Sequence, residues 1–341
     1  MFNPPNPLIP NPGQSVFLGD RLMTEQVHIT IVGTGCIGSS LGLALHRAAE
    51  PVHIVGHDKD SRHAGAAQKM KAVDRTDWNL INACEKADLI VLALPLNAID
   101  DTLKVIAPYL KPGCVITDTA SLKQPVMAAA ARWLPDTVSF VGGNPLVNVP
   151  TAGPDGARGD LFEECLYCLT PAPSAHPDAV SLLSSVVALL GARPFYLDAA
   201  EHDGLMAGVA QLPQALALLV WHSTSSDAGW RDMRKLAGGA LDAFGTLIGD
   251  DGAALADLLL SNRDHLLPWL DACADEINAL RRLLAEGQAE ALAAFGERSI
   301  EARREWLRDR KRQFAEELPL PPIEKPNLLH HIVPRRLLER K

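Results

Sequence analysis

The segment from Val27 to Gly38, VHITIVGTGCIG, constrains the fold of this chain more than any other part of the sequence. Its β-branched first half predicts a strand, and residues 39–47 have the apolar spacing of a helix. Three glycines in the spacing G-x-G-x-x-G stand between them, and in that context the pattern is typical of a turn that binds a dinucleotide pyrophosphate. A glycine-rich turn that binds nothing is the alternative. The expected cofactor contacts are Gly33, Gly35, Cys36, Ile37 and Gly38.

An acidic residue follows the second predicted strand, Val52 to His57. Asp58 stands where the carboxylate of a dinucleotide site accepts hydrogen bonds from the adenosine ribose and repels a 2′-phosphate. Asp58 therefore favours NAD over NADP as the cofactor. The neighbouring cations Lys59 and Arg62 leave NADP as the less favoured alternative.

Strand and helix patterns alternate up to residue 198, which predicts an α/β fold with a doubly wound parallel sheet. Ligands bind such sheets beyond the carboxyl ends of the strands. Leu94 and Pro95 end one predicted strand, so we expect them to contact the cofactor. After the first two strands, further strands are expected at 87–95, 115–118, 139–143, 166–170 and 194–197.

The composition excludes several classes of function. A formal net charge of −9 argues against nucleic acid or an anionic membrane as a partner, and no apolar run is expected to span a bilayer. No histidine pair has metal-binding spacing, so no metal site is expected. Scattered cysteines and the lack of a secretory signal indicate a cytoplasmic protein. Cys165 and Cys168 fall in a predicted strand and would face opposite ways, so we expect reduced thiols, with a redox or zinc site as the alternative.

The chain divides into four parts by composition. Residues 1–24 are rich in Pro, Asn and Gly and are expected to be disordered, and residues 25–198 form the dinucleotide-binding domain. Residues 199–315 are rich in Ala and Leu and predict a helical domain, in which Pro213 should kink the first helix. Residues 316–341 form a Pro-rich and then basic tail. The apolar surface of the helical domain predicts a homodimer.

These motifs together resemble the prephenate/arogenate dehydrogenase family of tyrosine biosynthesis. The resemblance rests on the segments GTGCIG, DTASLK, GGNPL, AGPDGARGDLF, LTP, EHD and AQLPQALA. It implies a Rossmann-type nicotinamide-binding domain, an all-helical dimerisation domain and an active site between them. It also implies an oxidative decarboxylation, in which hydride leaves the ring carbon that bears the hydroxyl and loss of carbon dioxide makes the ring aromatic.

Departures from the family pattern fall in the substrate pocket. The family usually has a histidine, which accepts the proton of the substrate hydroxyl, where this chain has Asn144. Gln211 and Gln214 replace two further histidines, and Gly245 takes the place of an arginine that binds a carboxylate. An amide can bond a hydroxyl but is no base near neutral pH. These departures predict an altered substrate or an altered chemistry.

The candidate catalytic residues are the polar groups of these motifs. Ser121 is expected near the nicotinamide or as a helix N-cap, and Lys123 as a cation for a carboxylate or as a surface lysine. Asn144 is expected at the reacting carbon or in a turn. His202 titrates near neutral pH, with a structural role as the alternative, and Asp203 is expected to cap the helix that the pair opens. The full set is Ser121, Lys123, Asn144, His202 and Gln214.

Three hypotheses for the function follow. The leading one is an NAD-dependent prephenate or arogenate dehydrogenase that acts on a small cyclohexadienyl acid. The second keeps the fold but changes the substrate, for example to an amino-substituted prephenate, because an amine suits an amide partner. The third is a non-catalytic NAD-binding protein that has lost its proton-transfer group. The intact glycines, Asp58 and Ser121 weigh against the third hypothesis.

Overall fold

The computed structural model describes residues 26–48, 51–149 and 153–316, so the predictions for residues 1–24 and for the tail beyond residue 316 lie outside the described residues. The strands are β1 (Val27–Val32), β2 (Val52–His57), β3 (Arg75–Thr76), β4 (Leu89–Leu92), β5 (Val115–Asp118), β6 (Ser139–Pro145), β7 (Leu166–Pro171) and β8 (Arg193–Tyr196). The helices between them are α1 (Cys36–Arg47), α2 (Ser61–Lys69), α3 (Leu80–Cys84), α4 (Leu96–Ile106), α5 (Gln124–Trp133) and α6 (Pro177–Leu189), with the short turns η1 (Ala107–Tyr109) and η2 (Pro154–Gly156).

The eight strands form one sheet in the order β3-β2-β1-β4-β5-β6-β7-β8. The first six run parallel, which confirms the doubly wound arrangement. The expectation of a wholly parallel sheet is wrong at one edge, because β7 pairs with β6 in the antiparallel direction and β8 follows β7. The reason is the connection. The chain leaves β6 at its carboxyl end, passes η2 against α1 and α2, and returns at the same end, where Tyr167 faces Pro145.

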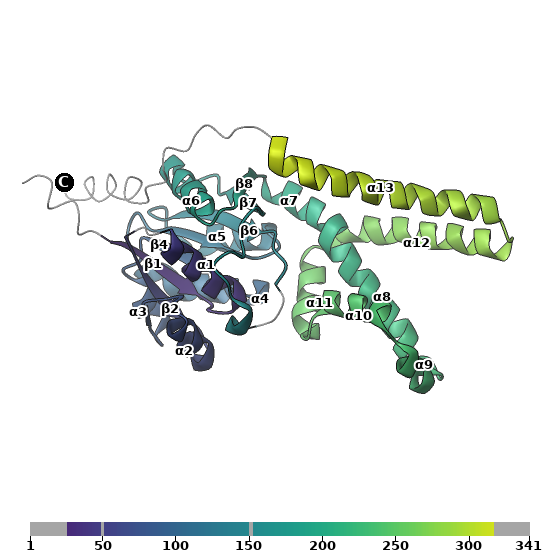
Figure 1. The fold of residues 1–341 in the computed structure, drawn as a ribbon. Coiled ribbons are helices and arrows are strands. Elements are labelled where there is room, and N and C mark those ends of the chain that lie inside the picture. The colour runs from purple at the N-terminus through teal and green to yellow at the C-terminus, as the bar shows by residue number, and fades with distance from the viewer. Residues whose placement is uncertain (1–25, 49–50, 150–152, 317–341) are drawn as a thin grey trace, which may run out of the picture.

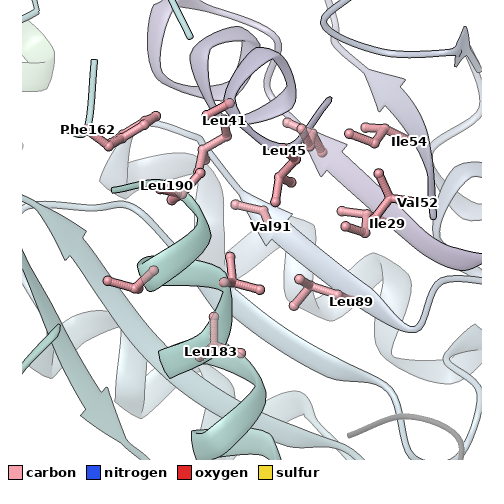
Figure 2. Packing of buried hydrophobic residues seen from close by; sticks show 14 of the residues in the cluster. Ile29, Leu41, Leu45, Val52, Ile54, Leu89, Val91, Phe162, Leu183 and Leu190 are labelled. Carbon is pink, nitrogen blue, oxygen red and sulfur yellow. The ribbon is translucent and has the colours of Figure 1, made fainter. Parts of the chain in front are cut away.

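Apolar layers hold helices on both faces of the sheet. Residues 89–92 of β4 alternate between the two layers, as expected for a strand that is buried on both sides. Leu41 and Leu45 of α1 and Leu183 of α6 pack in the layer that Figure 2 shows, together with Ile29 of β1. The opposite layer receives α4 and α5 through Ile99, Leu103, Val126 and Ala129.

The helical region follows β8 and extends away from the sheet. Its elements are α7 (Ala199–Met206), η3 (Ala207–Gln211), α8 (Leu212–Ser225), α9 (Trp230–Leu236), α10 (Gly239–Ile248), α11 (Gly252–Ser261), α12 (Arg263–Ala285) and α13 (Ala289–Glu316). Figure 1 shows α7 and α8 leading from the sheet toward α9, while α12 and α13 run side by side as a long hairpin. Many apolar side chains of this region are more than half exposed, among them Leu205, Val209, Leu219, Leu236 and Leu260.

The first long helix is interrupted where a kink was predicted. η3 is a π-helical turn, and Pro213 stands directly after it in the first turn of α8, where its missing N–H is tolerated. The joined helix Ala199–Ser225 is long and apolar enough, by length and composition alone, to cross a membrane. The expectation that no segment reaches that length is wrong on this criterion, because residues such as Gln211 interrupt the apolar run without ending the helix.

Candidate functional site

β1 ends in the glycine turn, and α1 begins directly after it. Gly33 has a φ of 94°, which favours glycine, and a Cβ there would overlap the carbonyl oxygen of Ala93. A Cβ on Gly38 would overlap the carbonyl oxygen of Gly33, so the third glycine lets α1 pack closely on the turn. A Cβ on Gly35 would meet no atom within 4 Å. The backbone at Gly35 is therefore open on the side from which a pyrophosphate would approach.

The N-terminus of α1 is suited to an anion. Within the described part of the chain no side chain caps it, and its first turn holds no acidic residue. The N–H groups of this turn, which includes Cys36 and Ile37, and the positive end of the helix dipole therefore favour a phosphate. Leu94 packs against Gly33, and Pro95 occupies the N-cap position of α4. Both lie beyond β4, which ends at Leu92 and not at the predicted residue 95.

Asp58 joins the end of β2 to the glycine turn. Its Oδ2 accepts hydrogen bonds from the backbone N–H and the hydroxyl of Thr34, at 2.8 and 3.2 Å, and its Oδ1 accepts one from the N–H of Asp60. Arg62 is engaged elsewhere. Its guanidinium pairs with Asp60 and holds the pKa of that partly exposed carboxyl well below its usual range. The open backbone, the uncapped helix and Asp58 together fit a dinucleotide.

Asn144, His202 and Asp203 form a hydrogen-bonded chain where α7 packs against the carboxyl end of β6. Asn144 Nδ2 lies 3.1 Å from His202 Nε2, and His202 Nδ1 lies 2.8 Å from Asp203 Oδ1. The three residues are 4 %, 1 % and 1 % exposed, so water hardly reaches the chain. An ionised carboxylate only accepts hydrogen bonds, so His202 Nδ1 donates to Asp203. The Asn144 NH₂ group that faces Nε2 can only donate, so Nε2 accepts from it. The structure thus brings two of the predicted site residues together.

Asp203 also joins the helical region to the sheet. Its Oδ1 accepts from the backbone N–H of Lys123 at 2.7 Å, and its Oδ2 accepts from that of Gln124 at 2.8 Å. These N–H groups open helix α5, so Asp203 supplies its cap. The expectation that Asp203 caps its own helix is wrong. Asp198 caps α7 by accepting from two N–H groups of its first turn.

Lys123 is fully buried between the ends of β5 and β6. Its Nζ donates to the carboxylate of Asp118 and, at 2.6 Å, to the carbonyl oxygen of Gly143. Asp118 in turn accepts from the backbone N–H groups of Ala120 and Gly143. Burial lowers the pKa of Lys123, whereas the adjacent Asp118 opposes that shift. Of the two alternatives for Lys123, the surface lysine is wrong, and its ion pair with Asp118 fixes the backbone next to Asn144.

The remaining predicted residues do not take part in the hydrogen-bonded chain of Asn144, His202 and Asp203. Ser121 is partly exposed in the loop between β5 and α5, and it is not the N-cap, which is Lys123. Gln211 is 2 % exposed and structural, since it accepts from Asn262 at 2.6 Å and donates to a carbonyl oxygen of α11. Gln214 lies on α8, and its buried Oε1 has no hydrogen-bond partner in the described part of the chain.

The cysteines are free thiols, and four of them, Cys36, Cys84, Cys114 and Cys168, are buried. All six are free, and burial raises the pKa of Cys165 and of Cys168 to about 11, so both are protonated at neutral pH. Among the described residues, no group of three or more His, Cys, Asp or Glu side chains could hold a metal ion.

Three residues of the site were missed by the sequence analysis. Asp118 was expected only as a strand end, Gln124 had no assigned role, and Asn262 was not considered. Asn262 donates to Gln211 and, at 2.9 Å, to the carbonyl oxygen of Asp203. A polar residue that follows a buried strand was a usable signal for Asp118, but no sequence pattern pairs Asn262 with residues more than fifty positions away.

Two family models match the chain. "Prephenate dehydrogenase, nucleotide-binding domain" matches residues 41–196, and "Prephenate dehydrogenase, dimerization domain" matches residues 198–296. Among curated proteins, prephenate dehydrogenase of Bacillus subtilis (strain 168) is 28% identical over 272 residues, which cover 78% of this chain and 72% of that protein.

Two further similarities are to a curated protein and to a solved structure. The 4-amino-4-deoxyprephenate dehydrogenase of Streptomyces pristinaespiralis is 28% identical over 194 residues, or 56% of this chain and 60% of that protein. The crystal structure of prephenate dehydrogenase from A. aeolicus in complex with hydroxyphenyl propionate and NAD+ has a TM-score of 0.76 at 22% identity, and the match covers 83% of this chain and 99% of that one. The structural match supports the fold.

Proposed function

Because the chain belongs to the prephenate/arogenate dehydrogenase family, we propose that it is an oxidoreductase that catalyses the NAD-dependent oxidative decarboxylation of a prephenate-type cyclohexadienyl acid. The observation that carries the proposal is the contact between Asn144 and His202. It joins the helical region to the carboxyl end of β6, on the edge of the sheet that also holds the glycine turn. Ligands of open α/β sheets bind at this edge.

The sheet region holds the cofactor in this proposal. The open backbone at Gly35 and the N-terminus of α1 receive the pyrophosphate, while Leu94 and Pro95 line the path beyond β4. The Asp58 carboxylate accepts from the ribose hydroxyls and disfavours a 2′-phosphate, which selects NAD over NADP. Bound there, NAD supplies the acceptor for the substrate's hydride.

The substrate lies beyond β5 and β6. β1 and β6 are three strand spacings apart, or roughly 14 Å, so separate groups serve the pyrophosphate and the reacting ring. Ser121 and Asn144 meet the substrate, and the free Oε1 of Gln214 offers a further acceptor from α8. Lys123 and His202 act as positioning residues, because Lys123 fixes the backbone before Asn144 and His202 orients its amide. Aromatisation drives the reaction, so the residues chiefly position the ring.

The active form in this proposal is a cytoplasmic homodimer. The helical region exposes Val209, Leu236 and other large apolar side chains, which a second copy would cover. The family model that matches residues 198–296 describes a dimerization domain.

Two substituents at the reacting carbon are compatible with this reaction. A hydroxyl is the substituent in prephenate and arogenate, and an amine is the one in the substrate of the S. pristinaespiralis relative. Asn144 is the residue that bears on the choice, because its amide hydrogen-bonds either group but removes a proton from neither.

The test is turnover of prephenate, arogenate and 4-amino-4-deoxyprephenate with NAD, followed as the formation of NADH and carbon dioxide. We expect equimolar NADH and carbon dioxide from at least one of them. If calorimetry shows NAD binding but no substrate yields either product, the chain is a non-catalytic NAD-binding homologue and the proposal is wrong.

A further inference from the structure

The orientation of the Asn144 amide narrows the substrate class, and the argument rests on the proposed function. We infer that the reacting carbon of the substrate bears an amino group, whose N–H is held by the carbonyl oxygen Oδ1 of Asn144. The first step is the anchor. The two backbone N–H groups that open α5 can only donate, so both oxygens of Asp203 face them as acceptors.

The anchor fixes the histidine. Asp203 Oδ1 receives the hydrogen of His202 Nδ1, because an ionised carboxylate has no hydrogen to give. The Asn144 atom that faces Nε2 is Nδ2, which can only donate, so Nε2 accepts through its lone pair. A buried carboxylate that selects one tautomer in this way also holds the plane of the ring.

The histidine in turn fixes the amide. Only the NH₂ end of Asn144 can donate to the Nε2 lone pair, and the observed contact at 3.1 Å is made by Nδ2. Within the described residues, the side-chain hydrogen bond of Asn144 is the one that Nδ2 makes to His202, and Oδ1 is the other end of that amide. The site therefore presents a carbonyl oxygen to the reacting group, and the imidazole lone pair behind it is already taken.

A hydroxyl is poorly served by such a site. When hydride leaves a carbon that bears a hydroxyl, the C–O unit becomes a protonated carbonyl, which is very acidic unless a base takes its proton. The amide oxygen is not such a base near neutral pH. General base catalysis is typically worth about 10²–10⁴-fold in rate, and a hydroxyl substrate forgoes it here.

A neutral amine needs no base. As the C–H bond breaks and hydride passes to NAD+, the nitrogen lone pair forms C=NH₂⁺, and the C–C bond to the carboxylate then breaks. Its electron pair enters the ring, carbon dioxide leaves and a neutral aromatic amine remains, so charge and protons balance. The positive N–H groups of the intermediate donate more strongly to Asn144 Oδ1 than the amine does, which stabilises the transition state.

The experiment compares two substrates that differ in one group, prephenate and 4-amino-4-deoxyprephenate, each with NAD. We expect kcat/KM for the amine to exceed that for the hydroxyl by at least about a hundredfold. Its value should rise with pH as the substrate ammonium becomes neutral. Equal or faster turnover of prephenate, or product from arogenate alone, would overturn the inference and leave the proposed reaction intact. No product from these two substrates or from arogenate would overturn the reaction itself.

A variant separates the amide from the rest of the pocket. Asn144→His restores a titrating group at this position, so prephenate turnover should increase at least about tenfold and amine turnover should decrease. Asn148→His, at an exposed position nearby, is the matched control and should change neither rate. Melting temperature and NAD affinity, unchanged in both variants, show that the fold is kept. Prephenate turnover that does not rise in folded, NAD-binding Asn144→His contradicts the role given to the amide.

Discussion

Asp203, on helix α7, accepts a hydrogen bond from the backbone N–H of Gln124, the first residue of helix α5, at 2.8 Å. One buried carboxylate thereby caps a helix of the sheet region and anchors the imidazole of His202. The same side chain therefore holds the helical region to the sheet region and positions His202. A substitution at Asp203 should affect both the stability of the protein and the geometry of the site.

Asp203→Asn should lower the free energy of unfolding by about 2–3 kcal/mol, because a buried charged acceptor is lost and an amide N–H is turned toward N–H donors. It should also reduce the preference for the amine substrate, since His202 is no longer held in one tautomer. Urea unfolding and the ratio of the two kcat/KM values measure these effects. Asp136→Asn, at an exposed position between α5 and β6, is the control. If the folded Asp203→Asn protein keeps the same ratio of the two kcat/KM values, Asp203 does not position His202 for the choice of substrate.

Substitutions at two glycines of the turn should have different effects, one on the stability of the protein and the other on the affinity for NAD. Gly38→Ala places a Cβ on the carbonyl oxygen of Gly33 and should cost about 1–3 kcal/mol of stability. Gly35→Ala meets open space, so stability should stay within about 0.5 kcal/mol while NAD affinity drops at least about tenfold. Gly65→Ala, in α2 with no atom near its Cβ, controls for the added methyl group. Unaltered NAD affinity in Gly35→Ala, measured by calorimetry, would place the pyrophosphate elsewhere.

Asp58 should set the choice of cofactor. We expect NAD to bind at least about tenfold more tightly than NADP, a difference of about 1.4 kcal/mol. Asp58→Asn removes the charge that repels a 2′-phosphate, so the two affinities should converge. Calorimetric titration of both cofactors gives the ratio, with Asp136→Asn as a distant control. NADP bound as tightly as NAD by the unmodified protein contradicts the role of Asp58.

The helical region should form a homodimer. Light scattering at micromolar concentration should give twice the mass of one chain. Val209 is 73% exposed, so Val209→Asp should shift the mass to that of one chain if this face is covered by the second copy. Trp78→Asp, at an 87% exposed residue of the sheet region, should keep the dimer. A mass of one chain for the unmodified protein would contradict the prediction of a homodimer.

The sequence predicted the elements that obey local rules. The glycine turn, the strand before Asp58 and the order of the other predicted strands up to β8 follow from periodicity and turn chemistry. The two-residue strand β3 was not predicted. The direction of β7 was not predictable from its own residues, because the route of the chain between β6 and β7 decides it. Lys123 misled because a lysine is usually exposed, and its burial depends on Asp118 and Gly143 from two other strand ends.

The sequence predicted which residues belong to the site better than it predicted which of them form hydrogen bonds with one another. Asn144 and His202 were both candidates, yet the contact between them joins residues 58 positions apart and depends on how α7 packs on β6. The same holds for Asp203. Its sequence neighbours suggest a helix cap, and the structure confirms a cap but on helix α5. Local chemistry selected the residue type, and tertiary packing selected the helix that it caps.

The π turn η3 makes the length of this segment matter as much as its composition. A π turn holds one residue more than a regular turn, so everything after it is rotated by about 100° relative to α7. Loss of one residue between Ala207 and Gln211 would leave a regular helix of nearly the same composition, yet would swing Gln214 and Trp221 to another side. Substitutions in α8 can thus change which groups meet the substrate, but only an insertion or a deletion changes the direction in which they point.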